Sequence, residues 1–284
     1  MAAPSNEVVG VNLLAKYGGT LIGGQTDLSL EKSVNLQEVE DKQSGFFGDS
    51  IPGFRETQIS ADNAYTGSGG DHLLGENDNV EVELTSQDGN TTEVVQGLQE
   101  MTCTLESDLV EVQTFQSADA KEYRVAGQSL DLSLSGQYFD PQATDGAGHD
   151  LILSAEEAGE ILTLTLTFGA LSISGDIRPE DWTLSAPAGN ETATFDSTFR
   201  HEGAITHSGT VDGGLDAGID AWFNRGTVSA LVEYQEGGSA VSGATKYEGS
   251  AYVSTLELAG TQGEPLDLNF DLEVTGGLTR NTQA

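Results

Sequence analysis

The sequence predicts an all-β protein, β-rich with one or two short helices, built as a β-sandwich or barrel. Three observations support this prediction. Apolar and polar residues alternate with a period of two through much of the chain, which indicates strands with one buried face. Glycine pairs and other turn signals separate these stretches. Only residues 154–160, which begin with the capping residue Ser154, have the pattern of a helix start.

The first strands are expected within residues 26–65. Alternation begins at Leu28 and Leu30 and resumes after a Gly- and Ser-rich excursion at residues 41–53. The excursion is predicted to be a long loop, closed by a turn at Pro52-Gly53. Loops of about a dozen residues between strands are usually either disordered or functional.

The later strands follow the same rule. The clearest is 266–274, in which leucines, Phe270 and Val274 share one face. Its other face is polar and consists of Asp267, Asn269, Asp271 and Glu273. In chain order the remaining strands are expected at residues 80–84, 92–105, 162–168, 170–177, 181–187, 192–199, 227–234 and 244–257.

The order of elements in residues 26–65 recurs in residues 101–139. Leu30-Glu31 corresponds to Leu105-Glu106, and Gly53 corresponds to Gly127, at an offset of about 74 residues. The working interpretation is an internal duplication or an inserted second β domain. Three parts are expected: residues 1–100 as a first β unit, 101–211 as a second, repeat-like unit, and 212–284 as closing strands.

The composition is strongly acidic. The chain has 46 Asp and Glu against 11 Lys and Arg, a net charge of −35. Disorder does not explain this charge, because 37% of the residues are hydrophobic and alternate regularly. An acidic, lysine-poor surface indicates adaptation to molar salt, where the Debye length is ~3 Å. The charge disfavours direct binding to nucleic-acid phosphates, which requires clustered basic residues.

The search for sites of chemistry is largely negative. Cys103 is the only cysteine, and the four histidines are scattered and are expected on the surface. The Asp- and Gly-rich segments 145–150 and 212–220 lack calcium-loop spacing and are expected to be solvated loops. Nucleophile-elbow, P-loop and zinc-protease motifs are absent, so no enzyme activity, metal or cofactor is predicted. The sequence also lacks an apolar run long enough to span a membrane and a secretory signal at its start.

A pattern of alternating strands, glycines and turn residues marks both ends of the sequence. At the first end it consists of Gly24-Gln25, Leu28-Ser-Leu30, Asp41-Lys42, Ser44-Gly45, Pro52-Gly53, Thr57-Gln-Ile59-Ser60, Asp62 and Tyr65. At the second end it consists of Tyr247-Glu-Gly249, Ala251 to Leu256, Gly263-Glu264, the 266–274 strand and Gly276-Gly-Leu278-Thr279. This pattern resembles the major tail (tail tube) proteins of long-tailed bacterial and archaeal viruses, of the lactococcal-phage major tail protein type. Together with the acidic composition, the resemblance implies a haloarchaeal tailed virus as the source.

The resemblance implies a structural virion protein, assembled in the host cytoplasm, that forms stacked hexameric rings around a DNA-conducting channel. Its partners would be further copies of itself and other tail proteins such as the terminator, tape measure and baseplate, with DNA passing without specific binding. The segment 41–53 would stack the rings through Asp41, Lys42, Phe46, Phe47, Pro52 and Gly53. The polar residues Asp267, Asn269, Asp271 and Glu273 would face the lumen and repel DNA phosphates.

Two other interpretations remain open. A halophilic cell-surface or surface-layer β-sandwich module would share the acidic, β-rich composition, although the sequence shows no secretion signal. Another tail component, such as a tail terminator or a baseplate hub, would share the resemblance. Rings or tubes of the purified protein would distinguish a tube subunit from a monomeric surface module.

Overall fold

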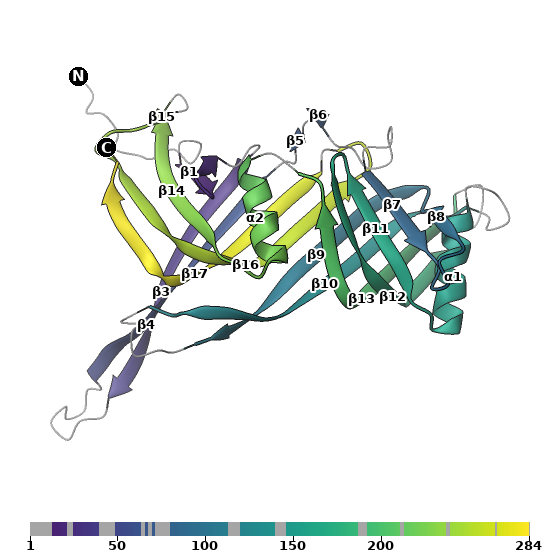
Figure 1. Ribbon diagram of the computed structural model, residues 1–284, viewed down its shortest axis with the longest axis horizontal. Coiled ribbons are helices and arrows are strands. Elements are labelled where there is room, and N and C mark those ends of the chain that lie inside the picture. The colour runs from purple at the N-terminus through teal and green to yellow at the C-terminus, as the bar shows by residue number, and fades with distance from the viewer. Residues whose placement is uncertain are drawn as a thin grey trace.

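A computed structural model describes residues 13–21, 25–39, 49–63, 66–67, 70–71, 80–112, 120–139, 146–186, 192–210, 213–236, 239–264 and 266–283. Within these ranges the chain consists mainly of antiparallel strands with two short helices (Figure 1). The prediction of an all-β fold with one or two short helices is therefore confirmed. No helix of the described ranges is long and apolar enough to cross a membrane.

Eight long strands form what we call the main sheet. They pair as four hairpins, and the order across the sheet is β3-β4-β17-β16-β9-β10-β13-β12. The hairpins are β3 (Gln25–Val39) with β4 (Asp49–Asn63), β9 (Leu98–Glu111) with β10 (Tyr123–Gln137), β12 (Leu171–Ser185) with β13 (Thr194–Ser208), and β16 (Thr245–Thr261) with β17 (Asp267–Thr282).

Two groups of shorter strands continue the sheet from the first halves of β16 and β12, where β14 (Val228–Glu236) pairs with β16 and β11 (Leu162–Phe168) pairs with β12. The group beside β16 also contains β1 (Leu13–Tyr17), β2 (Thr20–Leu21) and β15 (Ser239–Ala240), and the group beside β12 also contains β7 (Val80–Thr85) and β8 (Thr92–Val94). The helices are α1 (Ala147–Ala158) and α2 (Gly213–Phe223), and a separate small hairpin joins β5 (Thr66–Gly67) to β6 (Gly70–Asp71).

One pairing order occurs twice among these strands. In what we call the first set, the strands pair in the order β2-β1-β14-β16-β17-β4-β3. In the second set, they pair in the order β8-β7-β11-β12-β13-β10-β9. The second set is contiguous in sequence and lies between β4 and α2. The two sets join where β9 pairs with the second half of β16.

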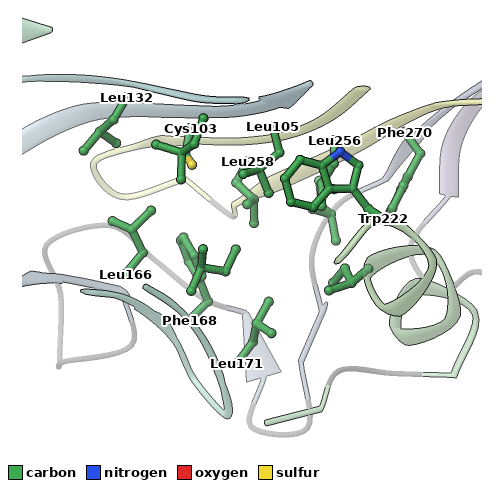
Figure 2. Packing of buried hydrophobic residues seen from close by; sticks show 14 of the residues in the cluster. Cys103, Leu105, Leu132, Leu166, Phe168, Leu171, Trp222, Leu256, Leu258 and Phe270 are labelled. Atoms are coloured by element: carbon green, nitrogen blue, oxygen red, sulfur yellow. The ribbon is translucent and has the colours of Figure 1, made fainter. Parts of the chain in front are cut away.

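The core lies against one face of the main sheet. Alternation along β17 buries Leu268, Phe270 and Leu272, as the sequence predicts. Figure 2 shows Leu256, Leu258, Cys103 and Leu132 on one side of this core and Leu166, Phe168 and Leu171 opposite them. Trp222 of α2 closes the core at one end (Figure 2). The hydrophobic burial that stabilises the fold is thus concentrated between the main sheet and the shorter strands.

The predicted turn at Pro52-Gly53 is wrong. Both residues lie inside β4, and Pro52 is the register partner of Leu36. The pairing shifts register between Val34 and Leu36, so the ladder is already irregular at this point. Such an irregularity tolerates a proline, which lacks the N–H that a regular ladder uses.

The two Asp- and Gly-rich segments expected as solvated loops contribute to helices instead. Residues 213–220 belong to α2, whose Ile219 and Trp222 are buried. Residues 147–150 begin α1, so this helix starts earlier than Ser154. His149 was expected on the surface but is fully buried, with its ring 4.5 Å from that of Phe195. Burial lowers the pKa of His149 and favours its neutral form.

Candidate assembly surface

The face of the main sheet opposite the core is polar, and we call it the polar face. Its residues alternate with the buried ones and are Ser, Thr, Asn, Gln, Asp or Glu on most strands. The carboxylates of this face include Asp27, Glu31, Glu56, Asp62, Glu100, Glu106, Asp131, Asp181, Asp196, Glu257, Asp267, Asp271 and Glu273. A single negatively charged surface therefore extends over strands of both sets.

The four polar residues predicted for the 266–274 strand do share one face. Asp267 is exposed, and Asn269, Asp271 and Glu273 are partly exposed. They lie among other acids, and this proximity has an electrostatic cost. Burial and then the nearby Asp27, Asp271 and Asp267 carboxylates raise the pKa of Asp62. The carboxylates on this face thus repel one another, as they would repel any other anion.

Glu273 lies in a small cluster where β4 and β17 pair. Its Oε2 atom is buried and has no hydrogen-bond partner. Burial, then Glu56 and Asp271, raise the pKa of Glu273 to about 7, while Lys121 acts in the opposite direction. The Lys121 Nζ instead forms an ion pair with Glu56, at 3.1 Å from the Glu56 Oε2. The Glu56 Oε1 also accepts a hydrogen bond from the Tyr123 hydroxyl at 3.2 Å.

This cluster fastens the segment around Lys121 to the base of the β3–β4 hairpin. The Lys121 N–H donates to the Arg55 carbonyl at 3.3 Å, and the Lys121 carbonyl accepts from the Gly276 N–H at 2.9 Å. The hairpin extends past this point, and the ends of β3 and β4 that lead toward residues 40–48 project beyond the other strands in Figure 1. Asp41, Lys42, Phe46 and Phe47 lie outside the described residues.

The main sheet has an open edge at each end. On one side, β3 pairs with β4, and no described strand pairs with its outer side along residues 27–33. On the other side, β12 pairs with β11 only through residues 171–177. Its second half, residues 178–185, pairs with β13 alone, and we call it the free half of β12. Leu184 of this free half is 49% exposed.

Open edges of this kind present unpaired backbone N–H and C=O groups that can pair with another strand. The sequence pattern identifies neither edge, because alternation reports which face of a strand is buried and says nothing of its neighbours. No group of three or more His, Cys, Asp or Glu in the described part of the chain is placed to hold a metal ion. The features available for function are therefore a polar face, a projecting hairpin and two edges.

No protein-family model and no curated protein matches the sequence. Solved structures do show partial similarity. A chain from the tail of an empty gene transfer agent particle, refined helically with C6 symmetry, is 17% identical, with a TM-score of 0.38 over 47% of this chain and 98% of the other. A chain of the SPP1 tail tube is 14% identical, with a TM-score of 0.37 over 49% and 81%.

A chain from the sixfold-symmetrised baseplate of the anti-feeding prophage is 7% identical, with a TM-score of 0.34 over 46% of this chain and 92% of the other. The chain thus spans most of the length of each of these proteins, while each covers about half of it. At TM-scores below 0.5, these similarities do not assign a function to the chain.

Proposed function

We propose that this chain is the major tail tube subunit of a long-tailed virus, of the lactococcal-phage type, with a haloarchaeal host. Copies associate into hexameric rings, and the rings stack coaxially into the channel that conducts viral DNA. The observation that carries the proposal is a long antiparallel sheet with one buried face, one acidic face and an open edge at each end. Joining such edges into a closed barrel removes them.

In this arrangement the polar face lines the channel. Its carboxylates, including Asp267, Asp271 and Glu273, repel DNA phosphates, so the genome slides without adhering. Asn269 contributes a neutral polar group to the same wall. A density map of the assembled tube tests this assignment, and these residues on the tube exterior would rule it out.

The projecting β3–β4 hairpin makes the contact between rings. The resemblance assigns this contact to Asp41, Lys42, Phe46 and Phe47, and to Pro52 and Gly53, which belong to β4. Aromatic side chains are favoured anchors at protein interfaces. Deletion of residues 43–50 is expected to leave a soluble protein that no longer polymerises, and unchanged tube formation would contradict the stacking role.

Negative-stain microscopy of the purified protein in molar sodium chloride tests the proposed function directly. Rings or tubes of constant diameter are the expected result. Only monomers at all protein concentrations would contradict the proposal and favour a surface module. Tail terminator, tape measure and baseplate proteins of the same virus are the further partners, and DNA is a passing cargo without specific binding.

A further inference from the structure

We propose that the chain is a tandem of two equivalent tube units and that copies join by pairing the outer edge of β3 with the free half of β12 in the next copy. This inference rests on the proposed function only in taking the copies to form rings. Its basis is the joint between the two strand sets, which lies within one chain and is fully described. That joint serves as a template for the joint between copies.

The registers show that the two sets are equivalent residue by residue. In the first set, Leu30 pairs with Ile59, Ile59 with Leu272, and Leu272 with Val253. The matching path in the second set runs through Cys103, Leu132, Phe199 and Pro179. Each path ends immediately before a residue that breaks the register.

The register breaks themselves coincide. The inserted residue is Ser254 in β16 and Glu180 in β12, and a second break lies beside Gly249 in β16 and Gly175 in β12. β-Bulges are specific features of a fold, so two matched pairs of them support a common origin for the sets. Unlike the first-set strand β16, however, the second half of β12 pairs only with β13 among the described strands and has no second partner.

In the first set, the corresponding second half of β16 is paired with β9 of the second set, which forms the internal joint. Residues 255–261 of β16 pair with residues 100–106 of β9, and Leu258 lies opposite Cys103. The equivalent of Leu258 is Leu184, and the equivalent of Cys103 is Leu30. The interchain joint therefore pairs residues 181–185 of one copy with residues 29–33 of the next, with Leu184 opposite Leu30.

Burial supports this register. Leu258 and Cys103 are both fully buried at the internal joint. Their equivalents are incompletely buried in a single copy: Leu184 is 49% exposed and Leu30 is partly exposed. When the two edges pair, Leu184 and Leu30 take the positions that the buried residues Leu258 and Cys103 occupy at the internal joint. The gain in apolar burial favours association.

Charge supports the same register independently. At the internal joint each acid opposes a threonine, Glu106 with Thr255 and Glu257 with Thr104. In the interchain joint each acid likewise opposes a hydroxyl side chain, since Asp181 lies opposite Ser33 and Glu31 opposite Thr183. A shift of two residues toward the start of β3 would instead place Asp181 opposite Glu31, and like charges directly across a sheet are destabilising.

The two edges lie at opposite ends of the sheet, so the contact is heterologous. Such contacts produce closed rings or open filaments, depending on whether the rotation closes. Each chain supplies two units in this scheme. The hexameric ring of the proposed function accordingly becomes a ring of six units supplied by three chains rather than by six.

Disulfide trapping tests the joint. The variant Leu30→Cys with Leu184→Cys is expected to form covalent multimers in assembled tubes, and the largest closed product is expected to contain three chains. Native Cys103 can remain, because burial raises the pKa of its thiol to about 12 and it is fully buried. Thr104→Cys with Glu257→Cys is the positive control, since these partly exposed positions lie opposite each other at the internal joint within one chain. Val34→Cys with Leu184→Cys, four residues out of register, is the negative control.

The outcomes separate this inference from the proposed function. Tubes without interchain bridges, when the Thr104→Cys/Glu257→Cys control does bridge, would overturn the joint and leave the tube function standing. A closed product of six chains would overturn the count of two units per chain. Absence of any ring or tube in the unsubstituted protein would instead defeat the proposed function.

A second pair of variants avoids any dependence on disulfide geometry. Leu184→Asp is expected to abolish assembly without changing the melting temperature of the monomer, because the side chain is exposed there. Ser185→Asp is the matched control, since Ser185 is the exposed polar-face neighbour of Leu184 and lies opposite Ser29 in the proposed register, so the new acid meets a hydroxyl side chain. Equal assembly of both variants would contradict the proposed register.

Discussion

The substitution Glu273→Gln is expected to remove a specific pH dependence of stability. The pKa of this carboxyl rises from 4.5 to about 7 in the folded protein, mainly through burial and then through Glu56 and Asp271. Between these values the native state retains a proton that the unfolded chain releases, so stability falls as pH rises from about 5 to 7. The full difference corresponds to at most ~3 kcal/mol, and solvent screening in this partly exposed cluster reduces it to ~1–2 kcal/mol.

Urea unfolding at pH 5, 6, 7 and 8 and at constant ionic strength provides the assay. The free energy of unfolding of Glu273→Gln, relative to the unsubstituted protein, should increase by ~1–2 kcal/mol from pH 5 to 7 and then remain constant. Glu106→Gln, which removes the same charge from an exposed position of the polar face, controls for net charge. A difference for Glu273→Gln that does not vary with pH would refute the reasoning, including the contribution of Glu56 and Lys121.

Three further predictions concern packing and salt. Gly136→Ala should destabilise the fold by ~1–3 kcal/mol, because the added Cβ would overlap the Gly97 carbonyl and lie 2.9 Å from the Leu98 Cα. The control is Gly127→Ala on the same strand, whose added Cβ meets only Asp108, at 3.7 Å. Similar loss of stability in both variants, measured by urea unfolding, would contradict this. Leu258→Ala should cost ~2–5 kcal/mol, and Leu184→Ala no more than ~0.5 kcal/mol in the monomer, because only the first side chain is buried. Equal losses of unfolding free energy in Leu258→Ala and Leu184→Ala would contradict the difference in burial between the two side chains. Sodium chloride at 1 M should raise the melting temperature well above its value at 0.1 M, since it shortens the Debye length from ~10 Å to ~3 Å around a net charge of −35. An equal increase in sucrose would point to preferential exclusion rather than charge screening.

Most strands could be predicted from the sequence because they have one buried and one polar face. Along 266–274 this periodicity is complete, and the strand forms as expected. The alternation in 80–84 and 162–168 likewise identifies β7 and β11. The periodicity does not show whether a strand continues, so 170–177 and 181–187 were predicted as separate strands. In the structure they contribute to the single strand β12.

Helix α2 could not be predicted because its local sequence argues against it. Glycine has low helix propensity, and the segment from 213 to 218 is rich in it. Tertiary packing explains at least one of these glycines: a Cβ at Gly218 would lie 2.7 Å from the Phe270 ring. The close approach of α2 to β17, together with burial of Trp222, stabilises a helix that the sequence alone does not favour.

The sequence predicts a repeat, but its alignment at Leu30 differs from the one that the registers give. Apolar identity aligned Leu30 with Leu105, whereas the strand pairings align it with Cys103. Both alignments keep the same side chains on the buried face, because a two-residue shift preserves the period of a strand. Sequence pattern alone therefore could not choose between them. The bulge positions in β12 and β16 make that choice.

The choice of alignment determines which residues of the two open edges lie opposite each other when copies join. A chain with one strand set would have a β3-like edge and a β12-like free half, and nothing in it would show how they fit together. Here the second set supplies β9 to the first, so one such joint is already formed and its register is visible. The remaining edges, β3 and the free half of β12, are the same two partners separated onto different copies. The register copied from the internal joint places Leu184 opposite Leu30 and leaves no acid opposite another acid, as the internal joint does with Leu258, Cys103 and its own acids.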